Sequence, residues 1–93
     1  MFKIIKILNH GGVYPFQVDA LTDDDRLIYG RYRWGRLTVQ IGKVGDFSEF
    51  AAVDGEKIFS QYIGIQYSGT MTLEEFIDHT KETLDFSEAV EDS

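Results

Sequence analysis

Nine glycines divide this chain into short segments, and their spacing limits the folds that the chain can adopt. The segments between the glycines are rich in isoleucine, valine, phenylalanine and tyrosine, which favour extended strands. Short β-rich segments separated by glycine-containing turns predict a meander of antiparallel strands. The glycines occupy positions 11, 12, 30, 35, 42, 45, 55, 64 and 69.

The stretch RYRWGR, residues 31–36, predicts a tight hairpin. If Trp34 and Gly35 form its two-residue turn, Gly35 supplies the positive φ that such a turn needs. Residues that then face one another across the two strands share a face of the sheet. One face is apolar and carries Ile28, Gly30, Tyr32, Leu37, Val39 and Ile41. The other face is polar and carries Tyr29, Arg31, Arg33, Arg36, Thr38 and Gln40.

The preceding hairpin gives the same division into faces. Asp23, Asp24 and Asp25 form its predicted turn, because short polar side chains bond to the nearby backbone. Phe16, Val18 and Ala20 then join the apolar face, opposite Tyr32, Gly30 and Ile28, and Asp19 lies on the polar face. A slip of one residue would place arginines in the core, so the sequence specifies this register strongly. Gly30 is expected to leave room for a neighbouring aromatic ring.

The remaining segments complete the predicted sheet with less regular patterns. Residues 2–8 are rich in isoleucine but do not alternate cleanly, which indicates a central strand or a bulge. Asp54-Gly55 is a second turn signal, expected to join strands at 49–53 and 57–63. Residues 57–63 also match one face of a short helix, but their β preference and the flanking glycines favour a strand.

The end of the chain predicts one helix and an acidic tail. TLEE at 72–75 is a capping-box sequence, and apolar residues follow it at helical spacing over 73–84. We therefore expect a single α+β domain over residues 1–86, with an antiparallel meander of four to six strands. The C-terminal α-helix packs on one face of this sheet. Residues 87–93 are expected to form an acidic, disordered tail.

The charge is spread unevenly along the chain. Residues 1–45 hold seven Lys/Arg and four Asp, a net charge of +3, whereas residues 46–93 hold two Lys and twelve Asp/Glu, a net charge of −10. These halves add up to the formal net charge of −7. Solubility with an acidic tail is one explanation, and separate basic and acidic faces with different partners are another.

Several classes of protein are disfavoured by composition. The chain has no cysteine, which excludes disulfides, thiolate metal ligands and a cysteine nucleophile. The apolar run MFKIIKIL is interrupted by lysine and is too short for a signal-peptide core. No run approaches the ~18 apolar residues of a membrane span. We expect a cytosolic protein that does not bind a membrane.

Catalytic and metal-binding chemistry find little support in the sequence. His10 and His79 are the histidines, and Glu75 precedes His79 by one helical turn, so a base with an orienting carboxylate is conceivable. No nucleophile is tied to either histidine by spacing. The acidic stretches at 23–25 and 46–56 lack the calcium-loop pattern. We therefore predict no catalytic residue, no cofactor and no metal.

A surface of arginine and aromatic residues is the candidate binding site. It comprises Tyr29, Arg31, Arg33, Trp34 and Arg36, residue types that contribute strongly to protein interfaces. We predict a non-enzymatic protein-interaction domain, regulatory or inhibitory, with an unidentified protein partner. Homodimerisation through this face or through an exposed edge strand is a second form of that hypothesis.

Three alternatives remain open. The same face suits stacking on single-stranded bases, although a net charge of −7 disfavours a nucleic-acid partner. A small enzyme using His79 or His10 is another alternative. The third is a merely solvated sheet face, whose arginines are neutralised by Asp19 or another acid.

Overall fold

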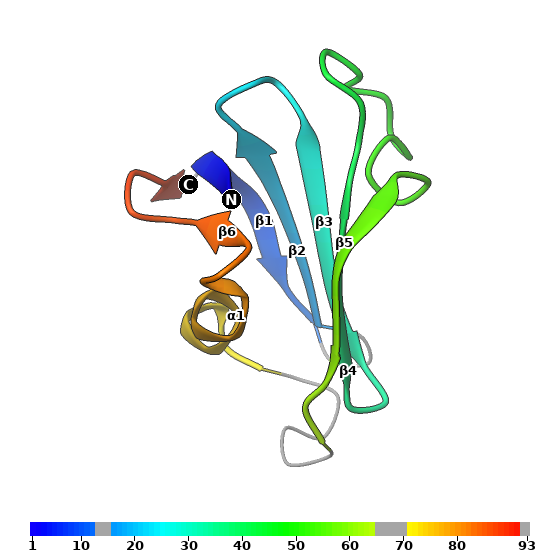
Figure 1. The fold of residues 1–93 in the computed structure, drawn as a ribbon, viewed down its shortest axis with the longest axis vertical. Helices are drawn as coiled ribbons and strands as arrows, with labels where there is room; N and C mark the ends of the chain where they lie inside the picture. Colours follow the sequence, from blue (N-terminus) through cyan, green and yellow to red (C-terminus); the bar gives the residue numbers. More distant parts are fainter. Residues whose placement is uncertain (13–15, 65–70, 92–93) are drawn as a thin grey trace.

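The computed structural model describes residues 1–12, 16–64 and 71–91. In these parts the chain forms a sheet and one short helix (Figure 1). The strands are β1 (Phe2–Gly11), β2 (Phe16–Thr22), β3 (Leu27–Arg33), β4 (Arg36–Ile41), β5 (Glu56–Tyr62), β6 (Leu84–Asp85) and β7 (Val90–Glu91). The helix, α1, comprises Leu73–Thr80. No helix in the described ranges is long and apolar enough to cross a membrane.

The sheet is strongly curled and mixed, so the expectation of a purely antiparallel meander is wrong. Its order is β5-β4-β3-β2-β1-β6, and β7 also pairs with β1. The first five strands are antiparallel neighbours, as expected. However, β6 and β7 run parallel to β1. The helix lies between β5 and β6 in the sequence and carries the chain back across the sheet. Such a crossover permits parallel pairing.

The registers of both predicted hairpins are confirmed. Arg33 pairs with Arg36 and Tyr32 with Leu37, and the ladder continues to the pair of Ile28 with Ile41. In the other hairpin, Phe16 pairs with Tyr32, and the Thr22 amide donates to the Arg26 carbonyl at 2.9 Å. The first strand is both central and bulged, with register shifts after Ile4 and after Ile7. Residues 57–63 are strand rather than helix as far as Tyr62.

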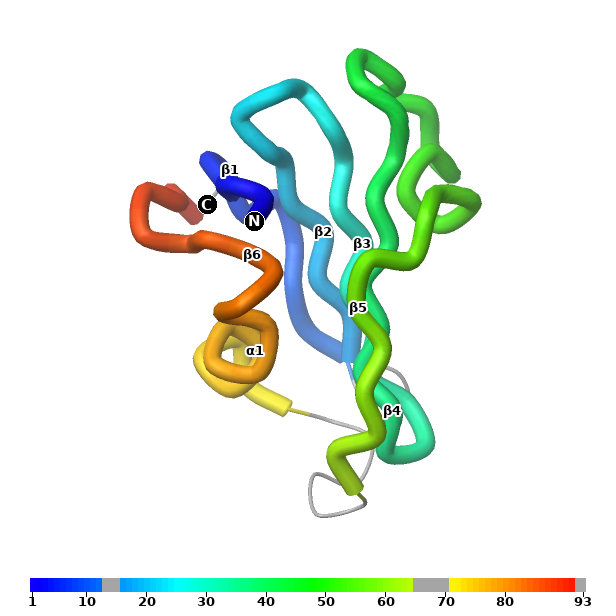
Figure 2. The backbone as a smooth tube through the Cα atoms, viewed as in Figure 1, coloured from blue at the N-terminus to red at the C-terminus, as the bar shows by residue number. Residues whose placement is uncertain are grey.

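The apolar face forms the core, on the concave side where α1 also lies (Figure 2). Phe76 of α1 is fully buried, and its ring lies 6.3 Å from that of Phe16 and 6.1 Å from that of Phe86. Gly30 provides the space for it: a methyl group at Gly30 would lie 2.5 Å from Cε1 of Phe76. The aromatic ring expected beside Gly30 is therefore that of Phe76.

The helix has the predicted start but ends earlier than predicted. The Thr72 hydroxyl accepts from the Glu75 amide at 3.1 Å, and the Glu75 carboxylate accepts from the Thr72 amide at 2.9 Å. These two bonds complete the capping box. The helix ends at Thr80 rather than at residue 84, because Leu84 is buried in β6 and pairs with Phe2.

One further expectation differs from the structure. Residues 49–53 form turns rather than a strand, and the Asp54 amide donates to the Phe50 carbonyl at 2.9 Å. Ala52 in this segment is buried. The segment at 87–91 is described by the structure: Val90 and Glu91 pair with β1, and Glu88 bonds to Lys3 at 2.5 Å. Residues 92–93 of the expected tail lie outside the described residues.

The close approach of Phe76 to Gly30 leads to a stability prediction. Replacing Gly30 with alanine forces the buried ring to move, and we expect the free energy of unfolding to fall by about 1–3 kcal/mol. Urea denaturation measures this loss. In a Phe76→Leu background the same glycine substitution should cost clearly less, because the ring that it strikes is gone. An equal loss of unfolding free energy in both backgrounds would show that the contact between Gly30 and the Phe76 ring does not determine the effect of the substitution.

Candidate functional site

The candidate surface is built by the turn between β3 and β4. Trp34 and Gly35 both have positive φ, 55° and 77°, so they form the two-residue turn that suits a twisted hairpin. Trp34 is 72% exposed at the tip. The confirmed register directs the side chains of Arg31, Arg33 and Arg36 to the outer, convex face of the sheet. The turn therefore gathers three arginines and a tryptophan at one corner of the molecule.

Four of the five predicted binding residues meet in one hollow, which we call the arginine hollow. It has a volume of about 250 Å³ and is lined by Arg31, Arg33, Trp34, Arg36 and Thr38. Tyr29, the fifth predicted residue, does not line it. Tyr29 instead lines a neighbouring hollow of about 260 Å³, between the sheet and the turns of residues 47–53. The predicted surface therefore divides into a basic part and a more apolar part.

The guanidinium groups of the arginine hollow have few partners in the described chain. Arg36 donates to the Ser60 hydroxyl at 3.2 Å, and Arg33 lies over the Trp34 ring at 5.4 Å. The Nε atoms of Arg31 and Arg33 are buried and bond to no acceptor in the described residues. Within the described residues, Arg26 forms an ion pair, but the three arginines of the hollow form none. The hollow thus concentrates hydrogen-bond donors and positive charge, and its arginines have no counterion among the residues that the structure describes.

Asp19, the acid expected to neutralise these arginines, does not act as their counterion. Desolvation by burial raises the pKa of Asp19. An adjacent guanidinium would lower that pKa, because a positive charge favours the ionised carboxylate. Asp19 pairs with Tyr29 and lines the neighbouring hollow. In the alternative of a merely solvated sheet face, Asp19 is therefore not the acid that neutralises the arginines.

Tyr62 and Ser60 of β5 are neighbours of the arginine hollow that sequence reasoning missed. Tyr62 pairs with Arg36 and Ser60 pairs with Thr38, so both share the outer face. The Tyr62 side chain is close to the turn, since a methyl group at Gly35 would lie 2.8 Å from its Cε1. Tyr62 is 58% exposed. The sequence carries no turn signal that fixes β5 against β4, because residues 42–55 do not form a simple hairpin loop.

Backbone bonds hold the end of β5 against the hairpin turn. The Gly35 carbonyl accepts from the amides of Ile63 at 2.7 Å and Gly64 at 3.2 Å. The buried Tyr32 hydroxyl donates to the Gly64 carbonyl at 2.5 Å. The core thus anchors both β5 and the hairpin, and the outer-face residues between them keep fixed positions.

The acidic residues lie mostly on other parts of the molecule. Glu74, Glu75 and Asp78 belong to α1, on the concave side of the sheet. Asp85 and Glu91 lie in β6 and β7, which pair with β1 rather than with the β3–β4 hairpin. The acids of residues 46–56 follow β4 at the end opposite to the Trp34 turn (Figure 1). The alternative of separate basic and acidic faces fits this arrangement.

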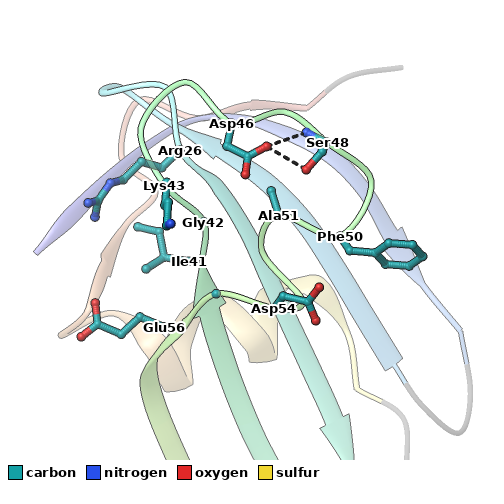
Figure 3. A pocket seen from close by; sticks show the side chains of 11 residues that line it. Arg26, Ile41, Gly42, Lys43, Asp46, Ser48, Phe50, Ala51, Asp54 and Glu56 are labelled. Atoms are coloured by element: carbon teal, nitrogen blue, oxygen red, sulfur yellow. Dashed lines mark hydrogen bonds between the residues drawn. The ribbon is translucent and has the colours of Figure 1, made fainter.

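Another hollow, of about 460 Å³, has a mixed lining and lies elsewhere (Figure 3). Arg26 and Lys43 line one part of it, and Asp46, Asp54 and Glu56 line others. Asp46 accepts hydrogen bonds from the Ser48 hydroxyl at 2.7 Å and amide at 3.0 Å, which lower its pKa. No group of three potential metal ligands occurs in the described residues. This mixture of charges indicates no single class of ligand.

The two histidines lie in different elements of the fold. His10 is in β1, and its Nε2 contacts the Glu91 carboxylate of β7. His79 is half-buried in the last turn of α1. Glu75, its expected orienting partner, uses one carboxylate oxygen in the capping box.

The raised pKa of Asp19 leads to a prediction about pH. Since folding raises this pKa above the unfolded value, the ionised carboxylate destabilises the native state at neutral pH. Replacing Asp19 with asparagine should therefore raise the free energy of unfolding at pH 7. This gain should fade as the pH falls through the raised pKa towards the ordinary value of 3.8, because the protonated carboxyl carries no charge. Urea denaturation of both proteins across this pH range measures the gain. A variant that is less stable than the wild type at pH 7 would contradict the prediction.

No protein-family model matches this chain, and neither the curated proteins nor the solved structures contain a match. The geometry and charge of the described residues are therefore the basis for a functional proposal.

Proposed function

We propose that this protein is a protein-interaction domain that binds an acidic segment of a partner protein in the arginine hollow. The observation that carries the proposal is the cluster of three guanidinium groups, those of Arg31, Arg33 and Arg36, which form no ion pair within the described residues. A ligand that supplies carboxylate oxygens to these groups forms charged hydrogen bonds and neutralises three positive charges that repel one another.

The aromatic residues around the hollow support a protein ligand. Trp34 is exposed at its rim, and Tyr62 lies across from Arg36 on the neighbouring strand. Tryptophan, tyrosine and arginine are the residue types most enriched among the residues that dominate protein–protein binding energy. Planar guanidinium groups also match the two oxygens of a carboxylate, which gives each pair a defined geometry.

The size of the basic surface favours a short acidic peptide over nucleic acid. The arginine hollow offers three guanidinium groups, whereas a DNA-binding protein commonly makes roughly 6–10 phosphate contacts. The formal net charge of −7 repels a long polyanion along the rest of the protein surface. A short segment avoids most of this repulsion, because its few charges stay within the hollow.

The proposal predicts saturable binding of an acidic peptide that Trp34 reports directly. Trp34 is the single tryptophan of the chain, so its fluorescence reports on the arginine hollow. We expect a synthetic peptide of alternating glutamate and threonine to change this fluorescence, and added salt to weaken binding. The Arg31→Gln/Arg33→Gln variant should bind at least about tenfold more weakly, since each charged hydrogen bond contributes about 1.5–3 kcal/mol.

The matched control is the Lys43→Gln/Lys81→Gln variant, which removes two positive charges outside the arginine hollow. Both double variants carry a formal net charge of −9, two lower than −7. The control should keep the wild-type affinity. Equal weakening in both variants would show that binding depends on overall charge rather than on this hollow. Tighter binding of an oligothymidylate of equal charge would favour the nucleic-acid alternative and overturn the proposal.

A further inference from the structure

We propose that the acidic segment binds as an additional antiparallel strand on the free edge of β5, with its acidic side chains alternating along the outer face. This inference rests on the proposed function, because it assigns a conformation to the same ligand. It also adds a second recognition element, the β5 backbone, which the arginine hollow does not contain.

The edge of β5 is a free template in the described structure. The strand ends the sheet order and pairs with β4 on one side. It contains no proline, and Ser60, Gln61 and Tyr62 are exposed. An edge with unpaired backbone groups readily accepts another strand. A register shift beside Phe59 ends the regular ladder, so the uninterrupted edge is short.

The backbone bonds already present show which β5 residues face this edge. The Ile63 amide donates to the Gly35 carbonyl at 2.7 Å, so Ile63 directs its backbone groups towards the β3–β4 hairpin. Backbone groups of successive strand residues point to alternate sides in the plane of a sheet. The amides and carbonyls of Ser60 and Tyr62 therefore point to the free edge. An added strand would exchange paired hydrogen bonds with these two residues.

The same two residues decide which ligand side chains meet the arginines. Ser60 and Tyr62 have their side chains on the outer face, since they pair with Thr38 and Arg36. Ligand residues directly opposite them share that face. The Arg36 guanidinium already extends over β5 to the Ser60 hydroxyl at 3.2 Å. It therefore lies about one strand spacing, roughly 4.8 Å, from the added strand, within reach of a glutamate side chain.

Charge favours an acidic ligand over a second copy of this chain as the added strand. Pairing β5 with β5 of a second copy would join the two outer faces into one surface. The Arg36 guanidinium groups, each of which lies beside Ser60 of its own β5, would then approach one another. Like charges on adjacent strands are destabilising, whereas an acidic strand gains attraction at the same positions.

The test compares two N-methylated forms of the peptide of alternating glutamate and threonine. In the antiparallel arrangement, glutamates on the outer face direct their amides to β5, and threonine amides point away from it. Methylating the glutamate amides should weaken binding at least about tenfold, because it removes the donors to the β5 carbonyls. Methylating the threonine amides should change affinity less than about twofold. Hydrogen exchange of the Ser60 and Tyr62 amides should slow when the unmodified peptide binds.

The outcomes separate this inference from the proposed function. If the unmodified peptide does not bind, or binds independently of Arg31 and Arg33, the proposed function fails. If it binds through those arginines but both methylated forms bind equally well, strand addition is wrong and the proposed function stands. If methylating the threonine amides weakens binding and methylating the glutamate amides does not, the antiparallel arrangement is wrong. Peptide-free dimerisation that protects the Ser60 and Tyr62 amides would show that a second copy is the occupant.

Discussion

The two-residue turn at Trp34-Gly35 is the constraint on which the rest of the structure depends. Its positive φ angles fix Arg33 opposite Arg36, and the alternation of side chains then places every residue of β3 and β4. The aliphatic residues and Gly30 turn inward, where Gly30 admits the ring of Phe76. The arginines turn outward by the same alternation. Core packing and the candidate site are therefore two consequences of one register.

This register also separates the charges of the protein. The helix packs on the concave face and holds its acids there, while the arginines occupy the convex face near the turn. In the described chain the Nε atoms of Arg31 and Arg33 have no acceptor, and the nearby Asp19 has a raised pKa rather than a lowered one.

The sequence predicts the parts of this protein that local chemistry determines. Turn residues and strict alternation determine β2, β3 and β4, and the capping box determines where α1 begins. Contacts between distant segments determine the rest. Leu84 fits the helical pattern, but it pairs with Phe2 in β6, so α1 ends at Thr80. Tyr62 and Ser60 join the candidate site through the β4–β5 register, which no turn signal in residues 42–55 specifies.

The most direct test of this account is the register of β3 against β4, measured by nuclear Overhauser effects in solution. In a two-residue hairpin, Tyr32 with Leu37 and Gly30 with Val39 form the non-hydrogen-bonded pairs, whose Cα atoms lie about 4.5 Å apart. The account predicts strong contacts between the Hα atoms within each of these pairs. Contacts between the Hα atoms of Tyr32 and Arg36 instead would place an arginine on the core face, and both the core and the arginine hollow described above would be wrong.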